Sequence, residues 1–121
     1  MVGCSPRPRR DSHRIAALLQ QRGNRVLPVN PQACPGEILG ETCHPGLSAL
    51  PAGTAVDVVD IFRRADAAGE HVDEAIAIGA DAVWMQLGVV DRAAAERALE
   101  AGLDVVMDRC PAIEVRRLGL V

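Results

Sequence analysis

The stretch AVWMQLGVVDRAAAERALEAGLDVVM, residues 82–107, decides the fold class of this chain. It begins and ends with apolar runs rich in β-branched residues, which are typical of strands covered on both faces. Between them lies an Ala-rich helical pattern, which Asp91 precedes as an N-cap and Gly102 follows as a stop signal. A strand, a helix and a second strand in this order predict two parallel strands joined by a right-handed crossover.

The same alternation of apolar runs and helical patterns extends along the rest of the chain. We predict further strands at residues 1–2, 25–29 and 56–62. We predict helices from Asp11 or Ser12 to Gly23, over residues 70–78 and 113–118, and a short one near residues 47–50 of a Pro- and Gly-rich loop.

These elements predict an α/β fold in a single domain over residues 1–121. Right-handed crossovers turn them into a three-layer, doubly wound parallel sheet of about five strands, which is Rossmann-like. Only Met1 and Val2 precede Gly3, so the first strand is expected to be shortened at the N-terminus.

The composition disfavours several classes of function. The 121 residues include 13 arginines and no lysine against 16 acidic residues, so the net charge is −3, and aromatic residues make up only 2%. A mildly acidic chain with so few rings is not typical of a nucleic-acid binder. No apolar run approaches the ~20 residues that cross a bilayer, and the first residues lack a secretory signal. We therefore expect a cytoplasmic protein that binds neither nucleic acid nor membrane.

Cysteines and strand-end aspartates are the residues that catalysis would use, and each has a structural alternative. The four cysteines have no C-x-x-C spacing, so reduced thiols are expected and no metal site is predicted. Cys110 is either a nucleophile or a buried, inert thiol. Asp60 and Asp108 are either an acid/base pair or partners for loops and arginines. We expect a binding module without catalysis of its own and with no catalytic residue.

The loop after the first strand carries the strongest sign of a binding site. In a parallel sheet the ligand lies beyond the carboxyl ends of the strands. Gly3 lets the backbone approach a phosphate, Ser5 and Ser12 offer hydroxyls, and the next helix offers free N–H groups at its start. Arg9 and Arg10 add positive charge to a chain that is acidic overall. The alternative is a solvated turn whose arginines extend into water.

The motifs of the common nucleotide-binding sites are incomplete here. Ser5 stands at the second glycine position of G-x-G-x-x-G, and Asn30 stands where the second strand of an NAD-binding domain carries an acidic residue. A chain without lysine also lacks the lysine of a P-loop. Both NAD and nucleoside triphosphates are therefore disfavoured as ligands.

Six short motifs together resemble a known family. They are GCSPRP at 3–8, LPVNP at 27–31, ILGE at 38–41, VVDIFR at 58–63, VWMQLGV at 83–89 and VMDRC at 106–110. In this order and spacing they look like the small stand-alone CoA-binding proteins, which are similar to the Rossmann-type CoA-binding domain of the succinyl-CoA synthetase α subunit. The resemblance implies that this chain binds coenzyme A or an acyl-CoA.

The resemblance also implies a role for each matching position. The pyrophosphate is expected on the turn of Gly3, Cys4 and Ser5, with Arg9, Arg10 and Ser12. Asn30 and Pro31 are expected to border the adenosine, Phe62 and Arg63 to flank its 3′-phosphate or its adenine, and Gln86 and Gly88 to line the pantetheine path. His13, in the first helical turn, is either a phosphate contact or a solvent-facing residue.

Two other functions stay open at this point. One is a small NAD(P)-dependent oxidoreductase, against which Asn30 argues. The other is a subunit that acts in trans with an acyl-CoA synthetase. The expected partner is the small molecule CoA, and a homodimer or a synthetase partner is the remaining alternative for a protein partner.

Overall fold

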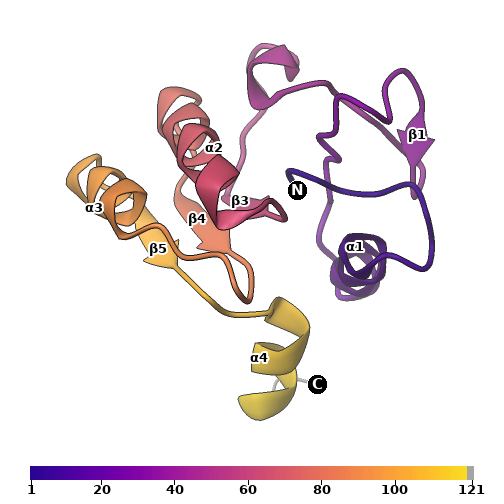
Figure 1. Cartoon of the computed structure of the whole chain (residues 1–121). Coiled ribbons are helices and arrows are strands. Elements are labelled where there is room, and N and C mark those ends of the chain that lie inside the picture. The colour runs from indigo at the N-terminus through magenta and orange to yellow at the C-terminus, as the bar shows by residue number, and fades with distance from the viewer. Residues whose placement is uncertain (120–121) are drawn as a thin grey trace.

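Figure 1 shows the computed structural model of the chain, which describes residues 1–119, so the last two residues of the expected domain lie outside it. The helices are α1 (Asp11–Gln21), α2 (Ala65–Ala77), α3 (Arg92–Glu100), α4 (Pro111–Arg117) and the 3-10 turn η1 (Leu47–Ala49). The strands are β1 (Glu37–Ile38), β2 (Glu41–Thr42), β3 (Val58–Ile61), β4 (Ala82–Met85) and β5 (Asp104–Val106).

The parallel sheet is formed by β3, β4 and β5, with β4 in the middle. Single parallel bridges extend it beyond β3, because Val2 pairs with Ile61 and with Val29, and Val29 pairs with His44. The order across the sheet is therefore His44, Val29, Val2, β3, β4, β5. Numbered along the chain this is 3-2-1-4-5-6, the order of dinucleotide-binding sheets. The predicted α/β, Rossmann-like fold is confirmed.

The N-terminal half of the sheet is less regular than the sequence predicts. The expected strand at 25–29 contributes only the bridges of Val29, since Pro28 has no N–H to donate to a ladder. The first strand is indeed short, with Val2 alone in bridges. His44 occupies an edge position that the sequence analysis did not predict. Only three of about five expected strands are therefore regular ones.

The starts of α1 and α2 differ from the predicted ones, and α4 begins two residues earlier than predicted. α1 begins at Asp11, but neither Asp11 nor Ser12 caps it, because Arg10 holds the N-cap position without a side-chain bond. α2 begins at Ala65 and runs through Gly69, where the sequence analysis expected no helix. A Cβ at Gly69 would come within 2.9 Å of Asp91 Oδ2, so the glycine permits close packing of α2 against α3.

The other predicted helix signals agree with the structure. Asp91 caps α3 by accepting a hydrogen bond from the Ala94 N–H at 3.0 Å. The short helix expected near residues 47–50 is η1. The helix predicted at 113–118 is α4, which begins at Pro111.

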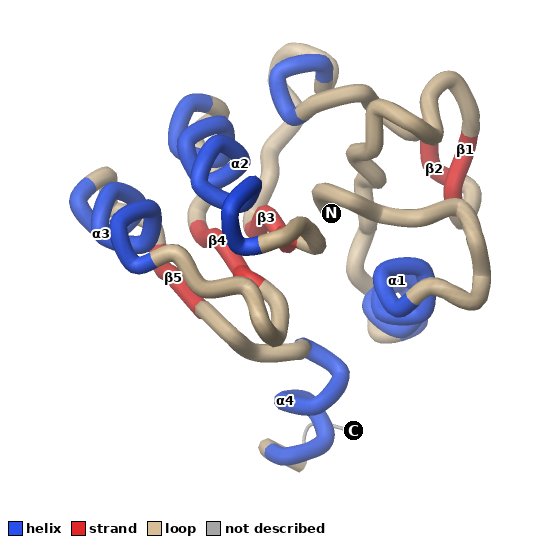
Figure 2. The backbone as a smooth tube through the Cα atoms, in the orientation of Figure 1, coloured by secondary structure: helices blue, strands red, loops and turns tan. Residues whose placement is uncertain are grey.

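An antiparallel hairpin, β1–β2, interrupts the parallel fold and was not predicted (Figure 2). Its two-residue turn, Leu39–Gly40, has positive φ at both positions, 53° and 81°. This is the type I′ geometry that matches the twist of hairpin strands. Leucine is rare at such a position, so the sequence carries no Asn-Gly or Asp-Gly signal for it.

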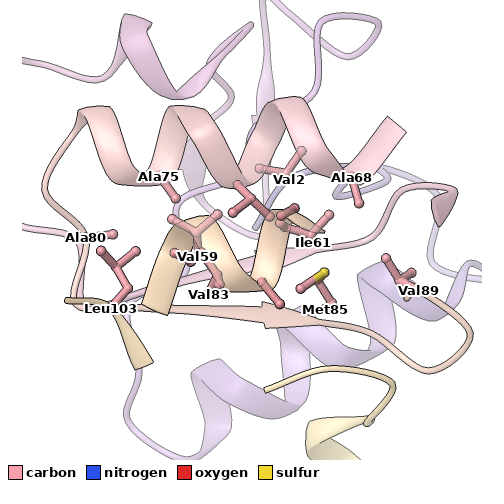
Figure 3. Packing of buried hydrophobic residues seen from close by; sticks show 14 of the residues in the cluster. Val2, Val59, Ile61, Ala68, Ala75, Ala80, Val83, Met85, Val89 and Leu103 are labelled. Carbon is pink, nitrogen blue, oxygen red and sulfur yellow. The ribbon is translucent and has the colours of Figure 1, made fainter. Parts of the chain in front are cut away.

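The buried apolar residues form two hydrophobic clusters. On one face, α2 packs over β3 and β4, and α3 packs over β5 and against α2, with small alanines in these contacts. Figure 3 shows Val59, Ile61, Val83 and Met85 in this cluster. On the other face, the second cluster includes Ile15 of α1. Among the described residues no helix has the length and apolar character to cross a membrane.

Candidate functional site

A cleft lies beyond the carboxyl ends of the strands, where the chain leaves Val2 for α1 and leaves β3 for α2. Its volume is about 870 Å³. The two exits lead to helices on opposite faces of the sheet, and such a switch point is where α/β sheets bind ligands. Its lining includes nine of the residues that the sequence analysis singled out: Gly3, Ser5, Arg9, Arg10, Ser12, Asn30, Pro31, Phe62 and Arg63.

Gly3 allows the loop after Val2 to lie close to the loop after β3. Its φ is +82°, and a Cβ there would lie 2.2 Å from the carbonyl oxygen of Phe62. The adjoining backbone is paired, because Phe62 N–H donates to the Val2 carbonyl at 2.8 Å. Only glycine fits both the conformation and the space at this position. The loop after Val2 therefore runs directly against the loop after β3.

Side chains that were expected to contact phosphate form hydrogen bonds within the loop after Val2. Ser12 Oγ accepts a hydrogen bond from the Ser5 N–H at 3.0 Å, and Ser5 Oγ accepts one from the Arg7 N–H at 3.1 Å. His13 Nδ1 lies 2.9 Å from the Ser5 carbonyl oxygen, so its ring faces the loop backbone. These bonds fix the turn over the start of α1, where the first N–H groups have no partner within the helix.

Asn30, which follows Val29, connects the chain at that point to the loop after Val2. Its Nδ2 donates to the Cys4 carbonyl at 2.9 Å, and its Oδ1 accepts from the Gln32 N–H at 3.0 Å. An acidic residue at this position has no N–H with which to hold the Cys4 carbonyl. The asparagine that the sequence analysis noted as a departure from NAD-binding domains thus has a structural role in the loop.

The charges of the cleft are unevenly distributed. Arg7, Arg9 and Arg10 are exposed on the loop, and Arg63 is exposed at the exit of β3. The part of the lining that belongs to α2 carries Glu70, Glu74 and His71. The arginines of the lining are suited to anions, and the α2 carboxylates offer hydrogen-bond acceptors.

The α2 wall is the part of the site that the sequence analysis missed. His71 Nδ1 lies 2.8 Å from Glu74 Oε1, with side chains 19% and 35% exposed, so the carboxylate orients a ring that borders the cleft. These residues lie within a helix and not directly after a strand, where the sequence predicts a ligand site. The sequence does carry a signal for this part of the site. Glu70, His71 and Glu74 have helical spacing, and they lie in the helix that follows β3 at the switch point.

Four predicted site residues lie outside the lining of this cleft: Cys4, His13, Gln86 and Gly88. Cys4 is fully buried in the cluster around Ile15. Gly88 N–H donates to Asp108 Oδ1 at 2.7 Å, which joins the exits of β4 and β5. Gln86 and Gly88, the expected border of the pantetheine path, therefore lie outside the lining of the cleft beside the loop after Val2. Among residues 1–119 there is no group of three or more metal-ligating side chains.

Gln86 pairs with a buried carboxylate instead of facing the cleft. Its Nε2 donates to Asp60 Oδ1 at 2.6 Å, and both side chains are buried. Asp60 Oδ2 is buried and has no hydrogen-bond partner among residues 1–119. Burial raises the pKa of Asp60 to about 6, against the opposing effects of the Gln86 hydrogen bond and of the Met1 ammonium.

We expect Asp60→Asn to remove a pH dependence of stability. The raised pKa means that the folded state keeps a proton that the unfolded state loses, so wild-type stability falls as the pH rises from about 4 to about 6 and then levels off. At neutral pH, where the buried carboxylate is ionised, Asp60 lowers the free energy of unfolding by about 3 kcal/mol. Urea unfolding of the wild type and of Asp60→Asn between pH 4 and pH 8 measures this pH dependence of the free energy of unfolding. The exposed Asp57→Asn is the control, and an unchanged pH profile in Asp60→Asn would contradict the assignment.

Comparisons with known proteins agree with this architecture. Residues 1–116 match the family model described as CoA binding domain. The uncharacterized protein YneT of Bacillus subtilis (strain 168) is 33% identical over 110 residues, which are 91% of this chain and 78% of that protein.

Two solved structures show the same fold over nearly the whole chain. A hypothetical protein from Pyrococcus horikoshii OT3 is 39% identical with a TM-score of 0.86, covering 97% of this chain and 80% of that one. A protein from Thermus thermophilus, called cell-free ID.343, is 36% identical with a TM-score of 0.89, covering 97% and 87%. With the family model spanning both exits that form the cleft, this chain belongs to the CoA binding domain family.

Proposed function

We propose that this protein binds coenzyme A or an acyl-CoA, with the phosphates on the loop after Val2. The observation that carries the proposal is the cleft at the switch point, where exposed arginines meet a helix start inside a chain of the CoA binding domain family. Helix N-termini and the forked donors of arginine are both suited to phosphate. Residues 1–121 form a single CoA-binding domain in this proposal.

The charge distribution favours one orientation of the ligand. Phosphates belong beside the arginines of the loop after Val2, with Phe62 and Arg63 flanking the 3′-phosphate or the adenine. The acceptors Glu70 and Glu74 on α2 suit the hydroxyl and amine donors of a nucleoside. The proposed role is binding, with no catalysis by this chain itself. Gln86 and Gly88 remain the proposed border of the pantetheine arm, which would extend out of the cleft past β4.

A thermal-shift panel with CoA, acetyl-CoA, NAD, NADP and ATP tests this function. A ligand present at about 100 times its Kd stabilises the folded state by about 2.7 kcal/mol, which raises the melting temperature by several degrees. We expect this shift with CoA or acetyl-CoA and a smaller one or none with the other three. Stabilisation by NAD or NADP without stabilisation by CoA would instead support the oxidoreductase alternative.

A further inference from the structure

A second hollow lies beyond the carboxyl ends of β4 and β5, where the loop after β4 comes beside α4 (Figure 1). Its volume is about 480 Å³. Leu87 of that loop and Ile113 of α4 both line it, and these residues are 61% and 52% exposed. Exposed apolar side chains that border one hollow are suited to bind an apolar group.

The charged side chains of this hollow pair within the chain. Glu114 Oε2 accepts a hydrogen bond from Arg117 Nε at 2.8 Å, and Glu114 Oε1 lies 3.8 Å from Arg109 Nε. Asp108 Oδ1 accepts from the Gly88 N–H at 2.7 Å. The described lining holds two arginines and two carboxylates, so their formal charges cancel. An uncharged group therefore fits the hollow better than an anion or a cation does.

The hollow and the cleft lie along the same edge of the sheet. Adjacent positions across the sheet are Val2, β3, β4 and β5, in this order. The cleft is lined by Phe62 and Arg63 after β3, and the hollow by Leu87 after β4 and Asp108 after β5. Neighbouring strands lie about 5 Å apart, so the hollow begins one or two strand spacings, roughly 5–10 Å, from this side of the cleft. One extended ligand can therefore reach both.

We propose that this hollow binds an apolar acyl group, which makes the ligand of this chain an acyl-CoA with a chain of several methylenes. The inference rests on the proposed function, which places the pantetheine arm beside Gln86 and Gly88. Leu87 lies between these two residues, so an arm that passes them brings its thioester-linked group to Leu87 and Ile113. A Cβ at Gly88 would meet no described atom within 4 Å, so this part of the path is open.

Titration of the wild type with CoA, acetyl-CoA, butyryl-CoA and hexanoyl-CoA tests the acyl site. Each methylene that leaves water contributes ~0.8 kcal/mol, which is about fourfold in affinity. Because the hollow is open on one side, we expect partial burial, with hexanoyl-CoA bound about tenfold or more tightly than acetyl-CoA. Equal affinities for the three acyl-CoAs overturn the acyl site and leave the proposed function standing. If none of the four ligands binds, the proposed function fails and the acyl site falls with it.

The variant Leu87→Ser/Ile113→Ser shows whether the gain in affinity arises in the hollow. Both side chains are exposed, so their removal disturbs little packing. The readout is the ratio of the hexanoyl-CoA and acetyl-CoA affinities within one protein, which cancels any effect on the phosphate end. We expect this ratio to fall below about threefold in the double variant. A double variant that keeps the wild-type ratio overturns the proposal.

Leu99→Ser is the matched control for the loss of an exposed apolar side chain. Leu99 lies on α3, is 58% exposed and lines neither the hollow nor the cleft. This variant should keep the wild-type ratio, and a ratio that falls as far as in the double variant overturns the assignment to the hollow. Light scattering without ligand tests the other occupant, a second copy of this chain. A dimer that Leu87→Ser/Ile113→Ser dissociates would mean that the partner copy covers the hollow, which also overturns the proposal.

Discussion

The double variant Arg9→Glu/Arg10→Glu is expected to bind CoA about a hundredfold more weakly than the wild type, or worse. Both arginines are exposed on the loop that borders the cleft, so their removal disturbs little packing. Each charge-assisted hydrogen bond to a phosphate contributes about 1.5–3 kcal/mol, and the introduced carboxylates add repulsion. Isothermal titration with CoA at low and at moderate salt measures the loss.

The control has the same change in net charge at two arginines outside the cleft. Arg22→Glu/Arg92→Glu fits, since both residues are exposed and neither lines the cleft. We expect this variant to keep its CoA affinity within about threefold, because charges beyond a Debye length of about 10 Å are screened. Equal losses in the two variants would mean that net charge, and not the loop, attracts the ligand. The melting temperature without ligand should stay close to the wild-type value in both.

The C-terminal half of the fold was predictable because its signals are local. The apolar runs that became β3, β4 and β5 are continuous, and Asp91 caps its helix through a contact three residues away. The N-terminal half depends on single bridges at Val2, Val29 and His44, which are too short to leave a pattern in the sequence. Long-range pairing, not local propensity, places these residues in the sheet.

The candidate site was predictable at the level of loops but not of side-chain direction. The residues after Val2 and after β3 do meet in one cleft, as the rule for strand ends predicts. Ser12 and His13 bond to the loop backbone because the turn curls over the helix start, a conformation that spacing does not reveal. His71 faces the cleft only because α2 packs on the face of the sheet beside it.

The second large effect is expected from Gly3→Ala, which should destabilise the fold by about 3–5 kcal/mol. The positive φ of +82° costs an alanine about 1–2 kcal/mol. The new Cβ would also lie 2.2 Å from the Phe62 carbonyl oxygen, a backbone atom that cannot rotate away. Relief requires the loop after β3 to move, which strains the hydrogen bond from Phe62 N–H to the Val2 carbonyl. Urea unfolding measures the difference from the wild type.

Gly79→Ala separates the cost of the positive φ from the cost of the contact between the new Cβ and the Phe62 carbonyl oxygen. Gly79 has a similar φ of +74°, but a Cβ there meets no atom within 4 Å, so only the backbone term of about 1–2 kcal/mol applies. A Gly3→Ala variant that loses no more stability than Gly79→Ala would show that the two exits are not in close contact. The expected excess also has a functional consequence, because the loop that moves away from Phe62 is the proposed phosphate-binding loop. Gly3→Ala should therefore weaken CoA binding under conditions where the variant is still folded, whereas Gly79→Ala, at the far end of α2 from the cleft, should leave it unchanged.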